Sequence, residues 1–133
     1  MEEAIAILRA HADAGDPNAA LARADVLCEY GREEELRALA EAGDPPAALS
    51  LPKLLRIQKR AGELRARADS GDRISARELA HLLADQGQVA ELRTRVEAGD
   101  GEAAMRLVDA LEQAGHREEA ERVRQFGLVL EED

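Results

Sequence analysis

The sequence predicts an all-α fold, a right-handed α-solenoid of about 4.5 tandem two-helix repeats with nine helices. Three observations predict it. Gly-Asp pairs recur every 28 residues, Leu-Arg pairs keep the same spacing, and apolar residues inside each repeat follow the helical period. A constant spacing without insertions indicates repeats, because unrelated loops do not keep one length. The recurring structural positions are Leu8, Gly15, Asp16, Leu36, Gly43, Asp44, Leu64, Gly71, Asp72, Leu92, Gly99 and Asp100.

The first helix of a repeat is clearest in the second repeat, over residues 33–42. Leu36, Leu39 and Ala40 share one face at the helical i, i+3, i+4 spacing. Gly43 is predicted to end this helix, because glycine adopts the left-handed conformation after a helix without strain.

The second helix is predicted to begin directly after this glycine. Asp44 is a good N-cap and Pro45 suits the first helical position, and Asp16 with Pro17 repeats that signal. In the third repeat the second helix is predicted over residues 73–86. The apolar residues expected to be buried on second helices include Leu79, Leu82, Leu83, Ala103, Ala104, Leu107, Val108 and Leu111.

The repeats follow one another without a linker and predict a single domain over residues 1–133. Gly31, Gly87 and Gly115 mark the turn from one repeat to the next. A single hairpin cannot bury its apolar face alone, so the hairpins are expected to stack in register. The repeats span residues 4–31, 32–59, 60–87 and 88–115, with a half repeat at 116–133 whose helix is predicted over 116–126.

Composition excludes several classes of protein. The 133 residues include 28 acidic and 18 basic ones, for a net charge of −10, and aromatic residues make up only 2%. An acidic chain with few aromatic side chains is a poor nucleic-acid binder. One cysteine, Cys28, rules out a disulfide scaffold, no apolar run approaches the roughly 18 residues of a membrane span, and the acidic Met1–Glu3 lacks the start of a signal peptide. We therefore expect a cytoplasmic protein.

The turn within each repeat resembles that of the tetratricopeptide superfamily. Residues 40–45 read Ala-Glu-Ala-Gly-Asp-Pro, closest to the Sel1-like branch, whose helices are joined through Ala-x-x-Gly-Asp/Asn-x-x-Ala. The matching positions are Ala12, Gly15, Asp16, Ala19, Ala40, Gly43, Asp44 and Ala47. The repeat is shorter than the tetratricopeptide unit of about 34 residues and lacks its bulky aromatic positions. It is also similar to a short actinobacterial repeat, Leu-Arg-Ala-x-Ala-(Asp/Glu)-Ala-Gly-Asp. The resemblance implies a bacterial scaffold that binds other proteins and carries no catalytic residues.

Each repeated arginine is followed one helical turn later by an acidic residue. The pairs are Arg9 with Asp13, Arg37 with Glu41, Arg65 with Asp69 and Arg93 with Glu97. One interpretation is a solvated face whose charges pair with one another at i, i+4, each pair contributing about 0.3–0.5 kcal/mol. The other is a strip on the first helices that faces a partner.

The second repeat departs from the pattern. Pro52 is predicted to kink or delay its second helix, and Lys59 replaces the turn glycine. Lys53, Arg56, Lys59 and Arg60 are spaced to lie near one helix face. They form either a positive patch that receives an acidic segment, such as the chain's own residues 131–133, or an ordinary solvated face in a decayed repeat.

No cofactor, metal or catalytic motif is expected. The repeated aspartates supply one carboxylate per turn, far from the 6–8 oxygens that calcium takes, so helix capping explains them. His11, His81 and His116 share no repeat position and predict no zinc site, and Cys28 is expected to be a buried thiol. Nucleophile-elbow, phosphate-loop and dinucleotide motifs are absent from the sequence, so we do not expect an enzyme.

Two functions remain open. The first is a protein-interaction scaffold that binds a partner peptide or domain through its repeated surface. The second is self-association through the terminal helices or the acidic tail. Ile5, Ile7 and Leu8 make the first helix apolar, and residues 126–130 either fold back as a cap or expose an apolar patch. The candidate partner-binding residues are Arg37, Arg65, Arg93, Lys53, Arg56, Lys59 and Arg60.

Overall fold

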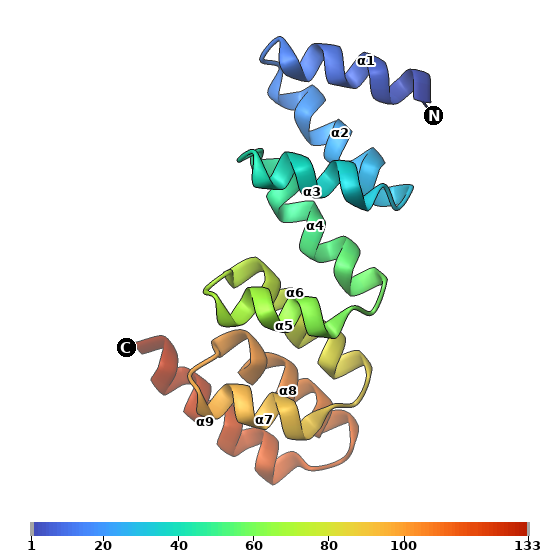
Figure 1. The fold of residues 1–133 in the computed structure, drawn as a ribbon. Coiled ribbons are helices and arrows are strands. Elements are labelled where there is room, and N and C mark those ends of the chain that lie inside the picture. Colours follow the sequence, from blue (N-terminus) through green and yellow to red (C-terminus); the bar gives the residue numbers. More distant parts are fainter. Residues whose placement is uncertain (1, 133) are drawn as a thin grey trace. The chain divides into compact units, whose positions relative to one another are not determined.

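The computed structural model describes the backbone of residues 2–132 and the side chains of residues 2–125. Within residues 2–132 the chain forms nine α-helices and no strand, as predicted (Figure 1). The helices are α1 (Glu2–Asp13), α2 (Pro17–Glu29), α3 (Glu33–Glu41), α4 (Pro45–Ile57), α5 (Ala61–Asp69), α6 (Arg73–Asp85), α7 (Val89–Glu97), α8 (Gly101–Gln113) and α9 (Arg117–Glu132). They form two compact units, an N-terminal unit over Met1–Gln58 and a C-terminal unit over Lys59–Asp133.

The N-terminal unit consists of two helical hairpins, α1 with α2 and α3 with α4. Helix α2 also packs on α3 and α4, so the second hairpin covers the apolar face of the first. Its most deeply buried side chains come from all four helices: Ile5, Leu27, Leu36, Leu51 and Leu55.

The C-terminal unit contains the hairpins α5 with α6 and α7 with α8, followed by α9, which packs on α8. Helix α6 packs on both α7 and α8, which repeats the arrangement around α2. The buried side chains fall at the repeated positions and at the predicted faces of the second helices: Leu64, Leu79, Leu83, Leu92, Leu107 and Leu111.

The repeated aspartates cap the second helices, as predicted. Each has an extended backbone and a side chain that accepts hydrogen bonds from the first turn of the following helix. Asp16, for example, accepts from the backbone N–H of Asn18 at 3.0 Å, and Asp72 accepts from that of Ile74 at 3.1 Å. The four caps are Asp16, Asp44, Asp72 and Asp100.

The turn after α4 contains a strained residue. Lys59 has a φ of 59°, in the left-handed region, where it is the only residue other than glycine among those the structure describes. Gly31, Gly87 and Gly115 stand at the same repeat position with φ values of 66°, 67° and 84°. A residue with a side chain costs about 1–2 kcal/mol in this conformation. Lys59 therefore destabilises the turn that joins α4 to α5.

We expect Lys59→Gly to raise the free energy of unfolding by about 1 kcal/mol, because glycine relieves this strain. Urea unfolding followed by circular dichroism measures the gain. The reverse change at the matched turn, Gly87→Lys, is expected to lose a similar amount. An unchanged midpoint for Lys59→Gly would show that the left-handed turn is not a source of strain.

Pro52 does not delay the second helix of its repeat, which was one of its two predicted effects, the other being a kink. Helix α4 starts at its capping aspartate and spans 13 residues, as do α2, α6 and α8. Pro52 removes only one backbone donor, and it lies buried beside Leu51 and Leu55, whose packing stabilises the turn that it weakens.

The last helix is longer than predicted. Helix α9 continues through Gly127 to Glu132, whereas the repeat pattern predicted an end near residue 126. A cap that folds back after Phe126 needs a turn there, and the helix has none, so that alternative is wrong in this form. The side chains of residues 126–130 lie outside the described ones, so the predicted apolar patch is not tested.

Candidate functional site

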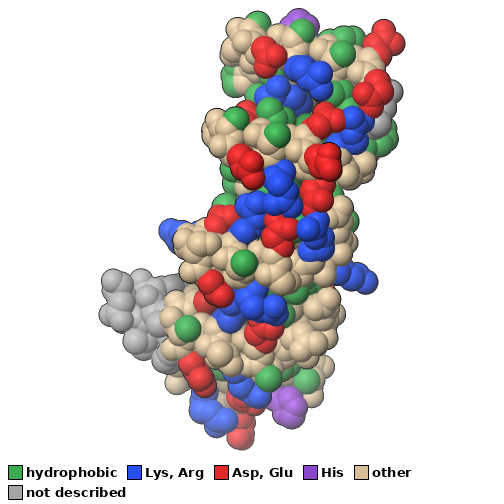
Figure 2. Space-filling view, viewed as in Figure 1, with side chains coloured by type: hydrophobic (Ala, Val, Ile, Leu, Met, Phe, Trp, Pro, Cys, Tyr) green, Lys and Arg blue, Asp and Glu red, His purple; other side chains and the backbone are tan. Residues whose placement is uncertain are grey.

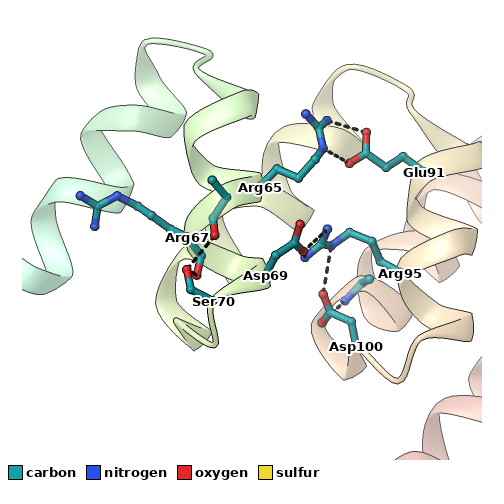
Figure 3. Close-up of polar contacts among 9 residues, drawn as sticks. Arg65, Arg67, Asp69, Ser70, Glu91, Arg95 and Asp100 are labelled. Carbon is teal, nitrogen blue, oxygen red and sulfur yellow. Dashed lines mark hydrogen bonds and ion pairs between the residues drawn. The ribbon is translucent and has the colours of Figure 1, made fainter.

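Ion pairs join the first helices of successive repeats within each unit. In every pair the arginine lies in one first helix and the glutamate lies 26 residues later, in the first turn of the next. Arg65 is bidentate, with Nε and Nη2 each 2.7 Å from an oxygen of Glu91 (Figure 3). The pairs are Arg9–Glu35 at 3.5 Å, Arg65–Glu91 at 2.7 Å and Arg93–Glu119 at 2.7 Å.

This pattern corrects the predicted pairing within each helix. In two repeats the acid four residues after the arginine contacts a different arginine: Asp13 contacts Arg23 and Asp69 contacts Arg95. The signal for the actual pairing is present in the sequence, because a glutamate precedes the repeated leucine in the second, third and fourth repeats. Arg9, Arg65 and Arg93 therefore lie on a self-paired face, although with partners in the next repeat.

The predicted partner-binding arginines of this row are engaged. Arg65 and Arg93 bind glutamates of the next helix, and Arg37 contacts Glu33 in its own helix at 3.2 Å. On the face shown in Figure 2, basic and acidic side chains alternate instead of gathering into a patch of one sign. A partner that used these arginines would have to displace glutamates that already neutralise them.

Pairing with Arg65 lowers the pKa of Glu91, chiefly through the hydrogen bonds, and raises the pKa of Arg65. A carboxyl group with a lowered pKa stabilises the fold at pH values above the ordinary glutamate pKa of about 4.3. This stabilisation is lost as the pH falls through the pKa that the group has in the folded chain. This pair therefore makes the C-terminal unit more stable at neutral pH than in acid.

We expect Glu91→Gln to remove up to about 0.5–1 kcal/mol of stability at pH 7, a range that allows for solvent screening of the part-exposed pair. The difference from the unaltered chain should vanish near pH 3, because Glu91 is then protonated and the pair is already lost. Unfolding in urea at both pH values measures this. Glu97→Gln is the control, since Glu97 is exposed and forms no ion pair among the described residues. An equal loss at both pH values would contradict the assignment.

The four basic residues of the second repeat do not share a helix face, contrary to the prediction. Lys53 and Arg56 lie on α4, whereas Lys59 lies in the turn and Arg60 precedes α5, because α4 ends at Ile57. Arg60 donates to Glu63 at 2.8 Å. Lys53 is exposed and forms no ion pair within the described part of the chain, so it remains a candidate contact for a partner.

The C-terminal unit contains a shielded arginine that was not predicted from the sequence. Arg95 of α7 lies between Asp69, at the end of α5, and Asp100, the cap of α8 (Figure 3). Its guanidinium is 3.5 Å from a carboxylate oxygen of each, and its side chain is 15% exposed. Arg95 Nε and Asp100 Oδ2 are buried without a hydrogen bond that meets geometric criteria, so the contact is mainly electrostatic.

The N-terminal unit builds the same cluster with an arginine from a different helix. Arg23 of α2 is 3.6 Å from Asp13 and 3.7 Å from Asp44, and its side chain is only 9% exposed. A leucine stands at its position in the other three repeats: Leu51, Leu79 and Leu107. An arginine at a leucine position was the signal that the sequence offered.

In each unit, the second helices expose one repeat position, in contrast to the self-paired first helices. In the N-terminal unit this position holds Leu21 and Leu49, each 51% exposed. In the C-terminal unit it holds the exposed Arg77 and Met105, which is 61% exposed. Large apolar side chains that recur at one position indicate an interaction surface more strongly than isolated ones.

A groove lies within the C-terminal unit, between the starts of α6 and α8. It consists of two adjoining hollows of about 440 Å³ and about 600 Å³. Residues common to both are Arg73, Ala76, Gly99 and Asp100. Ile74 and Met105 line the wider part, while alanines and glycines line much of the rest, so the groove is open and partly apolar.

Two arginines at this groove are unusual. Arg73 and Arg77 are exposed, lie one turn apart on α6 and form no ion pair among the described residues. A cation in the first turn of a helix is unfavourable, so Arg73 is not explained by the stability of α6. Two acids beside them are engaged. Asp72 accepts from Ser75 and the backbone of α6, and Asp100 accepts from the backbone of α8.

The described residues contain no group of three or more side chains that could hold a metal ion. Cys28 is buried, as expected, and its thiol lies 3.9 Å from the backbone oxygen of Ser50. His81 lies 3.4 Å from Asp85 on the same helix. Among the described helices, none has both the length and the apolar character to cross a membrane.

Comparisons with known proteins do not identify a family. No protein-family model, no curated protein and no solved structure matches this chain. The similarity to tetratricopeptide and Sel1-like repeats therefore remains a prediction from the repeated motif.

Proposed function

We propose that this chain is a protein-interaction scaffold of tetratricopeptide-like repeats, stacked as a right-handed solenoid, that binds a segment of a partner protein. The observation that carries the proposal is the groove of the C-terminal unit, where Arg73 and Arg77 lie beside Met105 and form no ion pair with any described residue. Two neighbouring arginines favour carboxylate ligands, and methionine adapts to varied apolar side chains. The preferred segment therefore carries an apolar residue close to an acidic one.

The second helices are the better candidates for the binding surface. Arg65 and Arg93 of the first helices already bind glutamates, so a ligand gains little there. Arg73 and Arg77 form no ion pair among the described residues, although Glu102 lines the same hollow. This assignment moves the expected contact from the predicted arginine row to a surface that the sequence did not indicate.

The proposed role is binding without catalysis, in the cytoplasm. Neither histidine nor cysteine lines the groove. Of its four carboxylates, those of Asp72 and Asp100 are held by backbone N–H groups and that of Asp69 contacts Arg95, while Glu102 also lines the wider part. A general acid or base needs a titratable group free to exchange a proton with a substrate, and the capping role opposes that.

The test begins with a photo-reactive amino acid placed at Met105, with a matched position at Glu118 on the exposed side of α9 as control. A protein captured at Met105 alone is then purified and its affinity is measured. We expect Arg73→Glu with Arg77→Glu to weaken binding at least about tenfold. The control pair Arg117→Glu with Arg122→Glu should leave it unchanged. A captured protein that binds all variants equally, or equal capture at both positions, would contradict the proposal.

A further inference from the structure

We propose that a second copy of this chain docks, as a two-fold symmetric pair, on the outer face of α2 and α4 in the N-terminal unit. This surface, called here the α2–α4 face, comprises Leu21 and Asp25 of α2 and Leu49 and Lys53 of α4. It is separate from the groove that carries the proposed function.

The α2–α4 face carries groups that nothing in its own unit covers. Leu21 and Leu49 are each 51% exposed. Asp25 and Lys53 follow them by one helical turn, are exposed, and form no ion pair among the residues that the structure describes. Exposed leucines beside unpaired charges of both signs indicate a contact surface whose partner has the same composition.

Two-fold symmetry makes this face complementary to itself. Helices α2 and α4 pack on each other, have equal lengths and occupy the same place in successive repeats, so they run in the same direction (Figure 1). A two-fold axis parallel to them and between them lays each α2 over the partner's α4. Leucine then meets leucine, and Asp25 of each copy meets the lysine at position 53 of the other.

The C-terminal unit offers no equivalent face. Arg77 stands where the N-terminal unit has an exposed leucine, and His81 one turn later already contacts Asp85. The same symmetric docking there would place Arg77 against Met105 twice and would lose the contact between leucines. The self-complementary pattern is therefore specific to α2 and α4.

A second copy could instead stack α1 on α9 in the way that successive repeats stack. The ion pairs between first helices disfavour that arrangement. Ile7 stands where later repeats carry the glutamate that accepts from the preceding arginine. Glu121 stands where earlier repeats carry that arginine. A copy stacked end to end would therefore place Glu121 against Ile7 and gain no ion pair, which leaves the side face as the better surface.

The size of the face sets the concentrations for the test. Helices of 13 residues are about 20 Å long, and two neighbours span about 18 Å, so the pair buries roughly 700 Å² in all. Stable interfaces bury about 1,200 Å² or more, so the dimer is weak and forms at concentrations from about 0.1 to 1 mM. Sedimentation equilibrium over this range is expected to show a rise in average mass.

Charge reversal gives the decisive experiment. Asp25→Lys and Lys53→Asp, each alone, place like charges opposite each other twice and are expected to weaken self-association at least about tenfold. An equimolar mixture of the two variants pairs opposite charges again and is expected to form a heterodimer. Circular dichroism and thermal unfolding should be unchanged, because both side chains are exposed.

The outcomes separate this inference from the proposed function. A monomer throughout the range, or two variants that associate as the unaltered chain does, would overturn the inference without affecting the groove. If the average mass still rises in both charge-reversal variants but no longer rises with Arg73→Glu, self-association belongs to the groove. That result would also overturn the inference about the α2–α4 face. Rescue only in the mixture supports the two-fold pairing.

Discussion

Arg23→Leu is expected to destabilise the N-terminal unit by about 2 kcal/mol, and adding Leu39→Arg is expected to restore most of that loss. Arg23 neutralises Asp13 and the shielded Asp44, whose side chain is 16% exposed. Leucine at this position leaves that carboxylate without a cation. Removal of one partner from a buried pair typically costs about 3–5 kcal/mol, and the smaller figure reflects the exposure of Asp13.

The rescue follows from a comparison of the two units. Positions 56 residues apart are equivalent, so Arg23 and Leu39 correspond to Leu79 and Arg95. The acids on either side, Asp13 with Asp44 and Asp69 with Asp100, are also equivalent. Each unit thus supplies one arginine and one leucine, with their positions exchanged. An arginine at position 39 should reach the same two aspartates that Arg95 reaches in its own unit.

Urea unfolding of both single variants and the double variant gives the coupling energy between the two positions. We expect favourable coupling of at least about 1 kcal/mol. Arg9→Leu is the control, since Arg9 is more than half exposed in its ion pair and should lose under about 0.5 kcal/mol. Additive effects of Arg23→Leu and Leu39→Arg would show that the arginine is not interchangeable between the two helices.

Local features of this fold were predictable from short stretches of sequence. Capping by Asp16 and its equivalents, and the left-handed glycines, depend on residues within one turn of each other, so the motif alone specifies them. The buried leucines followed from helical periodicity. Lys59 also keeps the left-handed backbone conformation of the glycines at its repeat position, because the chain has the same turn there.

The candidate site was less predictable, because it depends on contacts between repeats. An arginine such as Arg65 has an acid within its own helix and another 26 residues away, and only the packing of α5 on its neighbours decides between them. The groove likewise depends on how the starts of α6 and α8 approach each other. Arg73 and Arg77 appear in the sequence merely as two surface cations, and only the three-dimensional structure shows that they form no ion pair with the residues it describes.

The largest single effect is expected from Leu92→Ala, which should lower the free energy of unfolding by about 3 kcal/mol. Leu92 is fully buried at the repeated leucine position, so alanine loses both its transfer free energy and the contacts around the resulting cavity. Urea unfolding measures the total. Hydrogen exchange should show where protection is lost.

The matched variant Leu36→Ala carries the same change to the N-terminal unit, where the leucine is equally buried. In repeat proteins each hairpin contacts only its neighbours, so destabilisation is expected to concentrate where the cavity is made. Leu92→Ala should therefore speed exchange mainly in α5–α8, and Leu36→Ala mainly in α1–α4. Uniform loss of protection in both variants would instead mean that the two units unfold as one cooperative block, in which case the strained turn at Lys59 is not a boundary of stability.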